Sequence, residues 1–340
     1  MRNFLKTTTC LGSIALLAAC GSSADGTIVI SAEEEALRIF AEDAGDIADV
    51  LASEGRLAAR EVSEATWREN YATEGSDGAY TSVDGVVEIE GDGDDLLVTF
   101  AIAGDPSPDV IRIVDAASID EGFVTIDTEG LFFDLFVGGG LTIADLLDDT
   151  SGSGYARRIG IYYGQSGDGF GLQTETVFGT ETTDAMIADL GMTDAVATYD
   201  AFGQIRIRRD DADWNIFNAN LSGDISMEAD FGAGTVSGEM GNLFFEEFAG
   251  NTEVDDFEVD GSIIMNETSI QANAFGGSLS ADAALTDDDP GIGSVVAGVG
   301  YSGAFYGPEA EEIGGTFAGG GSYEGQGYLA IGTFTGGIDD

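Results

Sequence analysis

Between Asn220 and Phe231 the chain alternates strictly between polar and apolar residues. Leu, Gly, Ile, Met, Ala and Phe occupy every second position, and Asn, Ser, Asp and Glu occupy the positions between them. A period of two places successive side chains on opposite faces of an extended strand, whereas a helix would spread them around its axis. The segment therefore predicts a strand with one buried face and one face in water.

The same alternation returns twice further along, in residues 257–265 and 279–285. From Thr193 onward we expect about eight such strands with short connections. The expected turns are at residues 232–234, 246–251, 266–269 and 287–293. An antiparallel barrel buries one face of every strand and closes its own edges. We therefore expect a C-terminal eight-stranded antiparallel β-barrel over residues 181–340.

The first half of the chain has a different pattern. Apolar residues recur at helical spacing between Phe40 and Leu51, after a capping box at residues 31–34, and residues 57–67 predict a second short helix. Strands with a period of two are expected beyond these helices, at residues 87–89, 96–102, 131–137, 155–163 and 170–178. We expect residues 27–180 to form one α+β domain, so that the whole protein is mainly β.

The charge balance excludes several classes of function. The chain has 63 Asp and Glu residues against 12 Lys and Arg, a formal net charge of −51. A protein that neutralises phosphate groups needs the opposite sign, so nucleic acid is not an expected partner. The chain has no histidine, which excludes Ser-His-Asp and Cys-His catalysis and any imidazole ligand for a metal. We expect no catalytic residues, no metal site and no cofactor, and hence a protein that binds rather than catalyses.

The N-terminus has the pattern of an export signal. Arg2 and Lys6 precede an apolar stretch at residues 11–19, which is too short to cross a bilayer comfortably. The stretch ends in residues 17–21, Leu-Ala-Ala-Cys-Gly, which resemble the lipobox of bacterial lipoproteins. An ordinary cleaved signal with an incidental cysteine is the alternative.

The lipobox resemblance implies a lipid anchor. Residues 1–19 would be the signal peptide, Cys20 would be lipidated, and residues 20–26 would form a flexible tether. Gly21 rather than Asp follows the cysteine, which is typical of lipoproteins sent to the outer membrane of Gram-negative bacteria. We therefore expect the protein to be attached to that membrane through its lipid.

A fifteen-residue segment near the C-terminus, residues 303–317, reads GAFYGPEAEEIGGTF. It resembles the strand–turn–strand signature of the transferrin-binding protein B β-barrel family, and residues 197–199 and 234–238 resemble other barrel strands of that family. The positions that carry the signature are Gly303, Phe305, Tyr306, Gly307, Pro308, Ala310, Glu312, Gly314, Gly315 and Phe317.

These signature residues are expected to be structural. Phe305 and Tyr306 would send large rings to opposite faces of a strand, and Gly307 with Pro308 would end it. Gly314 and Gly315 would let the next strand approach closely. Ligand-binding residues would then lie on variable loops, which the sequence does not identify.

Members of the family are surface lipoproteins, typically with a handle domain before each barrel. The resemblance therefore implies one handle-like domain, residues 27–180, and one barrel, residues 181–340. It further implies an outer-membrane protein facing the cell exterior that binds a protein or nutrient carrier connected with iron or haem, without turnover, and hands the nutrient to a membrane transporter.

Two other functions remain open at this point. The protein could be a structural or adhesive envelope lipoprotein that captures no nutrient. It could also be an integral outer-membrane barrel, because alternation alone does not show which strand face is turned outward. A lipid anchor would be redundant on such a barrel, and the chain ends in Asp339-Asp340 rather than in an aromatic residue.

Two motifs suggest ligand sites but have simpler interpretations. Residues 298–303 spell the G-x-G-x-x-G dinucleotide fingerprint, but strand-forming residues follow where a helix is required, which favours a glycine-rich strand. The aspartates in residues 92–95 resemble part of a calcium loop, but Ala103 occupies the position of its bidentate Glu, which favours a hairpin turn. Weak calcium binding by residues 287–289 is the remaining possibility.

Two further clusters have a structural and a binding interpretation. Arg206 and Arg208 share a strand face and are expected to pair with acidic residues across strands. The alternative is an anchor for an anionic ligand. Phe244, Phe245 and Phe248 are expected to form a buried loop plug, and an exposed aromatic pair there would instead be a partner surface.

Overall fold

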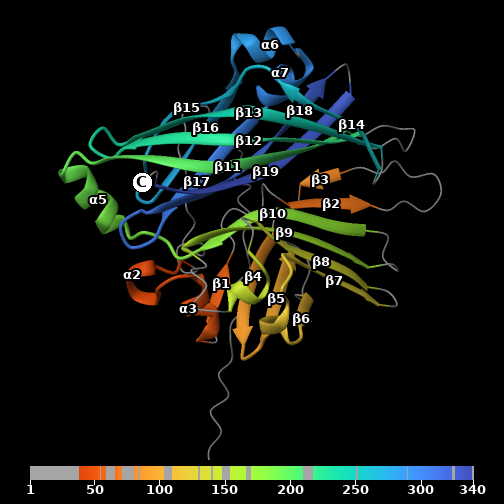
Figure 1. Cartoon of the computed structure of the whole chain (residues 1–340), viewed down its shortest axis with the longest axis vertical. Helices are drawn as coiled ribbons and strands as arrows, with labels where there is room; N and C mark the ends of the chain where they lie inside the picture. Colours follow the sequence, from red (N-terminus) through yellow and green to blue (C-terminus); the bar gives the residue numbers. More distant parts are fainter. Residues whose placement is uncertain are drawn as a thin grey trace, which may run out of the picture.

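The computed structural model describes residues 38–338 except 54, 59–65, 71–79, 83–84, 103–108, 129–130, 139–140, 148–153, 166–169, 210–216, 250–251, 289 and 324–325. Most of the regular structure in this part of the chain is β, arranged in three sheets. Figure 1 shows the sheet of C-terminal strands curled over two sheets built from the first half of the chain. We call the C-terminal sheet the barrel and the two N-terminal sheets the handle.

The barrel wall is a closed ring of antiparallel strands. Its members are β11 (Val196–Arg209), β12 (Phe217–Asp230), β13 (Thr235–Ala249), β15 (Ile263–Ser269), β16 (Ala274–Ala281), β17 (Val299–Tyr306), β18 (Glu312–Tyr323) and β19 (Gln326–Ile338). β11 pairs with β19, and the pairing of β12 with β13 completes the ring. The expected eight-stranded antiparallel barrel is confirmed.

One wall strand is broken in two. β14 (Thr252–Val259) pairs with the second half of β13, and β15 pairs with its first half. The two segments together therefore occupy the position of one strand in the barrel wall. The single strand expected over residues 257–265 is therefore interrupted. Gly261 lies in the break with φ +103°, and a Cβ there would overlap the backbone nitrogen of Leu285. That close approach and the left-handed backbone both favour glycine.

The strand expected over residues 279–285 is wrong beyond Ala281. Two short helices follow, α6 (Ala283–Asp288) and α7 (Pro290–Val296), and α7 packs against β16 and β18. The carboxylate of Asp282 accepts a hydrogen bond from the backbone nitrogen of Leu285 at 2.7 Å. This contact caps the first turn and starts a helix where the apolar alternation still continued.

Strand ends were predicted less well than strand faces. The expected turn at residues 232–234 does join β12 to β13. However, β13 continues to Ala249 and β15 continues to Ser269, so the turns expected at 246–251 and 266–269 lie mostly or wholly inside strands. The polar run at residues 266–269 and the adjacent Glu246 and Glu247 resemble turn sequences, but they lie within paired strands.

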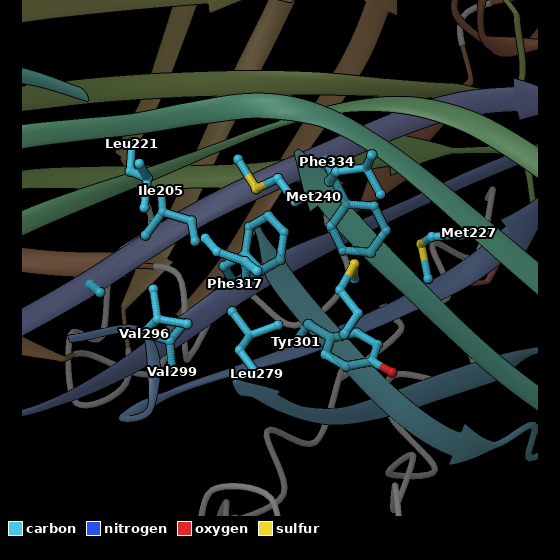
Figure 2. Packing of buried hydrophobic residues seen from close by; sticks show 14 of the residues in the cluster. Ile205, Leu221, Met227, Met240, Leu279, Val296, Val299, Tyr301, Phe317 and Phe334 are labelled. Carbon is cyan, nitrogen blue, oxygen red and sulfur yellow. The ribbon is translucent and has the colours of Figure 1, made fainter. Parts of the chain in front are cut away.

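Apolar side chains fill the interior of the barrel. Leu221, Ile225 and Met227, from the strictly alternating segment, are each at most 2% exposed, while the polar residues between them are half-buried or exposed. Side chains from the other walls meet them (Figure 2), among them Ile205, Met240, Leu279, Val296, Val299, Tyr301, Phe317 and Phe334. The apolar face of each strand is therefore the inner one.

The handle consists of a four-stranded and a six-stranded antiparallel sheet. The first has the order β1 (Arg56–Ala58), β4 (Gly85–Asp92), β5 (Asp95–Ile102), β6 (Asp109–Ile113). The second has the order β3 (Tyr80–Ser82), β2 (Thr66–Asn70), β10 (Phe170–Gly179), β9 (Ala156–Gln165), β8 (Leu131–Val137), β7 (Phe123–Thr128). The helical segments are α2 (Ala41–Ala44), α3 (Ile47–Ala52), the short 3₁₀ turns η1 (Ala116–Ser118) and η2 (Ala144–Leu146), and α5 (Asp184–Met192), which leads into the barrel.

The helix expected between Phe40 and Leu51 is split into α2 and α3 at Gly45, where φ is +79°. Asp46 then caps α3 by accepting a hydrogen bond from the backbone of Asp49. The helix expected over residues 57–67 is wrong, because both described ends of that segment are strands, β1 and β2. The capping box at residues 31–34 lies outside the described residues.

A single apolar cluster joins the two handle sheets. It contains Val87, Ile89, Leu96 and Val98 from the smaller sheet, and Phe133, Leu135, Val137, Ile159 and Ile161 from the larger one. The sheets therefore pack face to face. This leaves the second face of the six-stranded sheet free to meet the barrel.

Candidate functional site

The handle and the barrel meet where β9 and β10 lie against β18 and β19 (Figure 1). We call this contact the seam, and it is the candidate site because the signature segment, residues 303–317, borders it. Four apolar residues form a small core there, separate from the cores of the handle and the barrel: Ala156, Val177, Ala304 and Tyr306. Each is at most 2% exposed, so the two parts of the protein are in direct apolar contact.

Two adjacent signature residues connect the barrel core to the seam. The ring of Phe305 points into the barrel, with its centroid 5.1 Å from that of Phe231 and 5.3 Å from that of Phe275. Tyr306 points the other way, into the seam. Phe317, at the end of the signature, is 1% exposed in the barrel core. Successive strand residues face opposite sides, so β17 carries one aromatic ring into each core.

The turn after β17 needs its small residues. Gly307 has φ +88°, and a Cβ there would lie 2.7 Å from a ring carbon of Tyr155 in the handle. The hydroxyl of Thr182 donates to the carbonyl of Gly307 at 2.6 Å. Pro308 follows, and Ala310 is buried with φ +62°. A side chain larger than that of alanine would meet both the strained backbone and the packed surroundings at this point.

One of the segments that resemble barrel strands of the family, residues 197–199, contacts this turn. Tyr199 of β11 is fully buried and donates a hydrogen bond from its hydroxyl to the carbonyl of Ala310 at 2.7 Å. Burial raises the pKa of the Tyr199 hydroxyl far above its usual range, which keeps the group protonated and able to donate. This bond satisfies a buried carbonyl at a sharply turning part of the chain.

The signature glycines allow close approach. A Cβ on Gly315 would overlap the carbonyl oxygen of Ser302, and one on Gly303 would lie 2.7 Å from the carbonyl oxygen of Gly314. A Cβ on Gly314 would lie 2.8 Å from a methyl carbon of Val177 in the handle. Gly303 and Gly315 thus permit tight pairing within the barrel, and Gly314 permits contact across the seam.

Glu312, the first residue of β18, contacts the start of β9. Its Oε2 atom accepts hydrogen bonds from the backbone nitrogens of Ala156 at 2.9 Å and Tyr155 at 3.2 Å, and it lies 3.4 Å from Nη1 of Arg157. Burial raises the pKa of Glu312 and lowers the pKa of Arg157. The sequence analysis names Glu312 only as a structural signature residue, whereas in the structure its carboxylate joins the barrel to the handle.

A second polar cluster crosses the seam around Glu181. Its carboxylate accepts from Nε of Arg38 at 2.7 Å and from Nδ2 of Asn273 at 3.0 Å, and Oδ1 of Asn273 accepts from the backbone nitrogen of Phe305 at 3.1 Å. Arg38 also pairs with Asp184 at 2.9 Å. This cluster could not be predicted from the sequence, because nothing about an isolated glutamate in an acidic chain indicates that it is buried.

Arg206, one of the two arginines singled out from the sequence, pairs with an acidic residue on another strand, and that strand belongs to the handle. Nε of Arg206 lies 3.0 Å from the carboxylate of Glu175, which belongs to β10 of the handle rather than to a neighbouring barrel strand. The side chain of Arg208 lies outside the described residues. Nearby, the guanidinium of Arg158 lies over the ring of Phe202, 5.4 Å from its centroid. These contacts also cross between handle and barrel.

The phenylalanines near residue 245 form neither a loop plug nor an exposed pair. All three belong to β13, and Phe245 is 6% exposed with its ring 5.2 Å from that of Phe257. Phe244 is half-buried, and the side chain of Phe248 is not among those described. The expected loop is therefore replaced by a continuous strand.

The two motifs that were discounted as ligand sites lie in regular structure. The fingerprint at residues 298–303 runs into β17, a strand. Residues 92–95 form the hairpin between β4 and β5, where Arg112 contacts Asp92 and Asp95 at 2.6 Å each. Within the described ranges, no three His, Cys, Asp or Glu residues are grouped so as to hold a metal ion.

The expected lipid anchor, Cys20, lies outside the described residues, as do the signal peptide and tether at residues 1–26. In the part of the chain that the structure covers, no helix has the length and apolar character needed to span a membrane.

The seam as a whole is a fixed connection between the handle and the barrel. An apolar core, the Glu312 contacts and the Glu181 cluster all connect handle strands to barrel strands. Satisfied buried polar groups of this kind hold their partners in one geometry. The seam therefore keeps the outer surfaces of the handle and the barrel in a fixed position relative to each other.

Comparison with known proteins identifies the barrel segment. A family model described as the C-lobe and N-lobe beta barrels of Tf-binding protein B matches residues 193–337. A search of curated proteins found no match.

Solved structures to which the chain is similar include two transferrin-binding proteins B. Intact Ap-TbpB, with N and C lobes, is 15% identical with a TM-score of 0.38, and the match covers 83% of this chain and 61% of that one. The isotype 1 protein from serogroup B Neisseria meningitidis is 16% identical with a TM-score of 0.37, covering 83% of this chain and 58% of that one. The chain thus spans roughly three-fifths of these two proteins.

HpuA from Kingella denitrificans, solved in complex with human haemoglobin, is a third similar structure. It is 12% identical with a TM-score of 0.35, and the match covers 84% of this chain and 91% of that one.

Proposed function

We propose, from the match of residues 193–337 to the barrels of the transferrin-binding protein B family, that the chain is an outer-membrane lipoprotein that captures a protein ligand at the cell surface. Cys20 would carry the lipid, and residues 27–180 would form the handle domain. The single observation that supports this function best is the match of the barrel to a family named for binding transferrin.

The packing of the barrel supports capture on an outer surface. The apolar cluster occupies the barrel interior, with aromatic rings such as Phe275, Phe317 and Phe334 at its centre. A ligand would therefore dock on the outside, across loops of both parts. The seam would keep those loops in a fixed relation, which lowers the entropy lost on binding.

The charge of the chain supports a ligand with a basic face. At −51 the protein attracts positively charged surfaces, which speeds encounter and disfavours acidic partners. An iron or haem carrier protein with such a face is the ligand class that the family name suggests. The nutrient would then pass to a membrane transporter, with no chemical step on this chain.

The test uses intact cells that display the full chain. Labelled iron-loaded transferrin and labelled haemoglobin are added separately, and the bound label is measured against concentration. We expect saturable binding of one of the two, and its loss from cells that carry Cys20→Ser, which removes the lipid anchor. No saturable binding of either protein would contradict iron or haem capture and would favour a structural or adhesive lipoprotein.

A further inference from the structure

The hairpin of β7 and β8 lies at one side of the handle (Figure 1), and three of its aromatic side chains are exposed. Phe123 is 54% exposed, Phe136 is 46% exposed and Phe132 is 37% exposed. Phe123 and Phe136 are directly opposite each other in the strand pair, and Phe132 packs edge-on against Tyr162 with ring centroids 5.5 Å apart. We call these four residues the hairpin aromatic patch. Grouped exposed rings of this kind are typical of interaction surfaces.

The patch adjoins an open strand edge. β7 is the last strand of its sheet among the residues described. The backbone nitrogen of Val137 donates to the carbonyl of Gly122 at 2.7 Å. Bonded pairs alternate along an antiparallel ladder, so every second residue from Gly122 onward points its backbone groups at β8. Phe123, Thr125 and Asp127 point their backbone N–H and C=O groups outward, and their side chains are exposed.

Other parts of the handle cover this edge only as far as Glu121. The backbone nitrogen of Ile143 donates to the carbonyl of Glu121 at 2.8 Å, and that of Ala144 donates to the carbonyl of Ile119 at 3.1 Å. In the described part of the chain, no such bond reaches the three outward-pointing residues of β7. Proteins usually protect an edge with lysine, proline or a bulge, and the β7 sequence FVTIDT contains neither lysine nor proline.

The charge around the hairpin restricts what could occupy it. Residues 115–154 contain nine acidic residues and no Lys or Arg. Asp134 lies between Phe132 and Phe136 on the exposed side of β8, and Asp127 lies on the open edge. A second copy of the chain would bring the same negative charge to the interface and would be repelled. A positively charged strand would be attracted.

We propose that the open edge of β7 and the hairpin aromatic patch bind an extended, lysine- or arginine-bearing segment of a partner protein by strand addition. The outward backbone groups of Phe123, Thr125 and Asp127 pair with the added strand. Its apolar side chains pack on the aromatic rings, and its basic side chains meet Asp127 and Asp134.

This interaction goes beyond the proposed capture of a ligand. It uses the β7 edge of the handle sheet, which is separated from the seam strand β9 by β8, and it requires neither the lipid anchor nor an iron carrier. A protein that fails to bind transferrin or haemoglobin could still bind a basic strand here, so failure of one proposal can be told from failure of the other.

The experiment measures binding of a short peptide that alternates lysine and valine, and of a matched peptide with glutamate in place of lysine. Thr125→Pro removes one outward backbone donor, and an edge strand tolerates proline where its N–H faces solvent. Thr125→Val is the matched control, because it loses the same hydroxyl but keeps the N–H. Met192→Ser, at an exposed site on α5, controls for general loss of apolar surface.

We expect the lysine peptide to bind saturably and the glutamate peptide not to bind. Thr125→Pro should weaken binding of the lysine peptide by about tenfold or more, because it removes one backbone hydrogen bond to the added strand and disturbs the neighbouring ones. Thr125→Val and Met192→Ser should bind the peptide within about twofold of the unaltered chain. In the unaltered chain, the peptide should slow amide hydrogen exchange at Phe123, Thr125 and Asp127 but not at Val124. This second measurement does not depend on whether the proline variant folds.

Several outcomes would overturn the proposal. Equal binding of both peptides, absence of binding, or unchanged exchange at the three outward amides would exclude strand addition of a basic segment. Binding that survives Thr125→Pro in a folded protein would indicate general charge attraction. Self-association of the chain that Thr125→Pro abolishes would make a second copy the occupant instead.

Discussion

The carboxylate of Glu312 in the barrel lies 2.9 Å from the backbone nitrogen of Ala156 in the handle, although 156 residues separate them in the chain. Both residues lie where a strand begins, Glu312 at the start of β18 and Ala156 at the start of β9. One side chain therefore sets the position of a handle strand against a barrel strand.

Removing that side chain should loosen the seam. Glu312→Ala leaves the buried N–H groups of Ala156 and Tyr155 without their acceptor, and we expect a loss of about 1–3 kcal/mol in the free energy of unfolding. Glu312→Gln keeps an acceptor oxygen and should lose less. Glu309→Ala is the control in the same turn, because Glu309 is exposed, and it should change stability by less than about 0.5 kcal/mol. Denaturant unfolding measures all three, and equal effects of Glu312→Ala and Glu309→Ala would contradict this role.

Glu312 should also contribute to the pH dependence of stability. Burial raises its pKa in the folded protein above the ordinary value of 4.5, so the folded chain holds this proton at pH values where the unfolded chain has released it. The contribution of this proton to the free energy of unfolding is therefore complete at low pH, and it is lost as the pH rises through the pKa of Glu312 in the folded protein. The unaltered protein should gain stability relative to Glu312→Gln as the pH falls from about 7 to about 5.

That range stays above the sequence pI of about 4.1, which keeps the protein charged and soluble enough for the comparison. Unfolding of both proteins at several pH values gives the difference directly. Glu309→Gln is the control for loss of one carboxylate from the same turn. A difference between Glu312→Gln and the unaltered protein that does not change with pH would contradict the expected direction.

Much of the barrel could be predicted from the sequence because one physical rule determines it. Side chains that alternate along Asn220–Phe231 must face opposite sides of a strand, and the buried Leu221 and Met227 show that the apolar side is the inner one. The same rule failed at Ala283 and Leu285, because the carboxylate of Asp282 caps a helix there. Local capping overrode a pattern that extended over only seven residues, 279–285.

The seam could be predicted only in part. The signature identified Glu312 and Tyr306, but their partners Ala156 and Val177 are distant in sequence and have no distinguishing chemistry. A contact of this kind depends on how two finished sheets pack. Glu181 was missed for the same reason, since its burial follows from the docking of the handle and not from its neighbours in the chain.

The Glu181 cluster should be sensitive to loss of Asn273. Asn273→Ala removes one hydrogen-bond donor from the buried carboxylate of Glu181, which keeps Arg38, and one acceptor from the backbone nitrogen of Phe305, which keeps the carbonyl of residue 273. We expect a total loss of about 1–3 kcal/mol in the free energy of unfolding. Asn266→Ala removes side-chain hydrogen bonds at an exposed site and should cost less than about 1 kcal/mol. Equal stability of the Asn273→Ala and Asn266→Ala variants would show that the Glu181 cluster contributes little to the stability of the seam.

The signature glycines differ from other strand glycines in what surrounds them. Gly315→Ala would push a methyl group into the carbonyl of Ser302, and we expect it to destabilise the barrel by about 1–3 kcal/mol. Gly241→Ala is the matched control, because nothing lies within 4 Å of a Cβ at that position. The control should be neutral or slightly stabilising, because alanine loses less conformational entropy on folding. Thermal unfolding compares them, and a neutral Gly315→Ala would contradict the close approach.

The central claim is that this barrel is displayed on the outside of the cell, where it can meet a protein ligand. Protease treatment of intact cells, followed alongside a periplasmic control protein, tests it most directly. Surface display predicts that the chain is degraded while the control survives, and that both are degraded once the cells are lysed. Protection of the chain until lysis would contradict surface capture and would place the protein on the periplasmic side of the envelope.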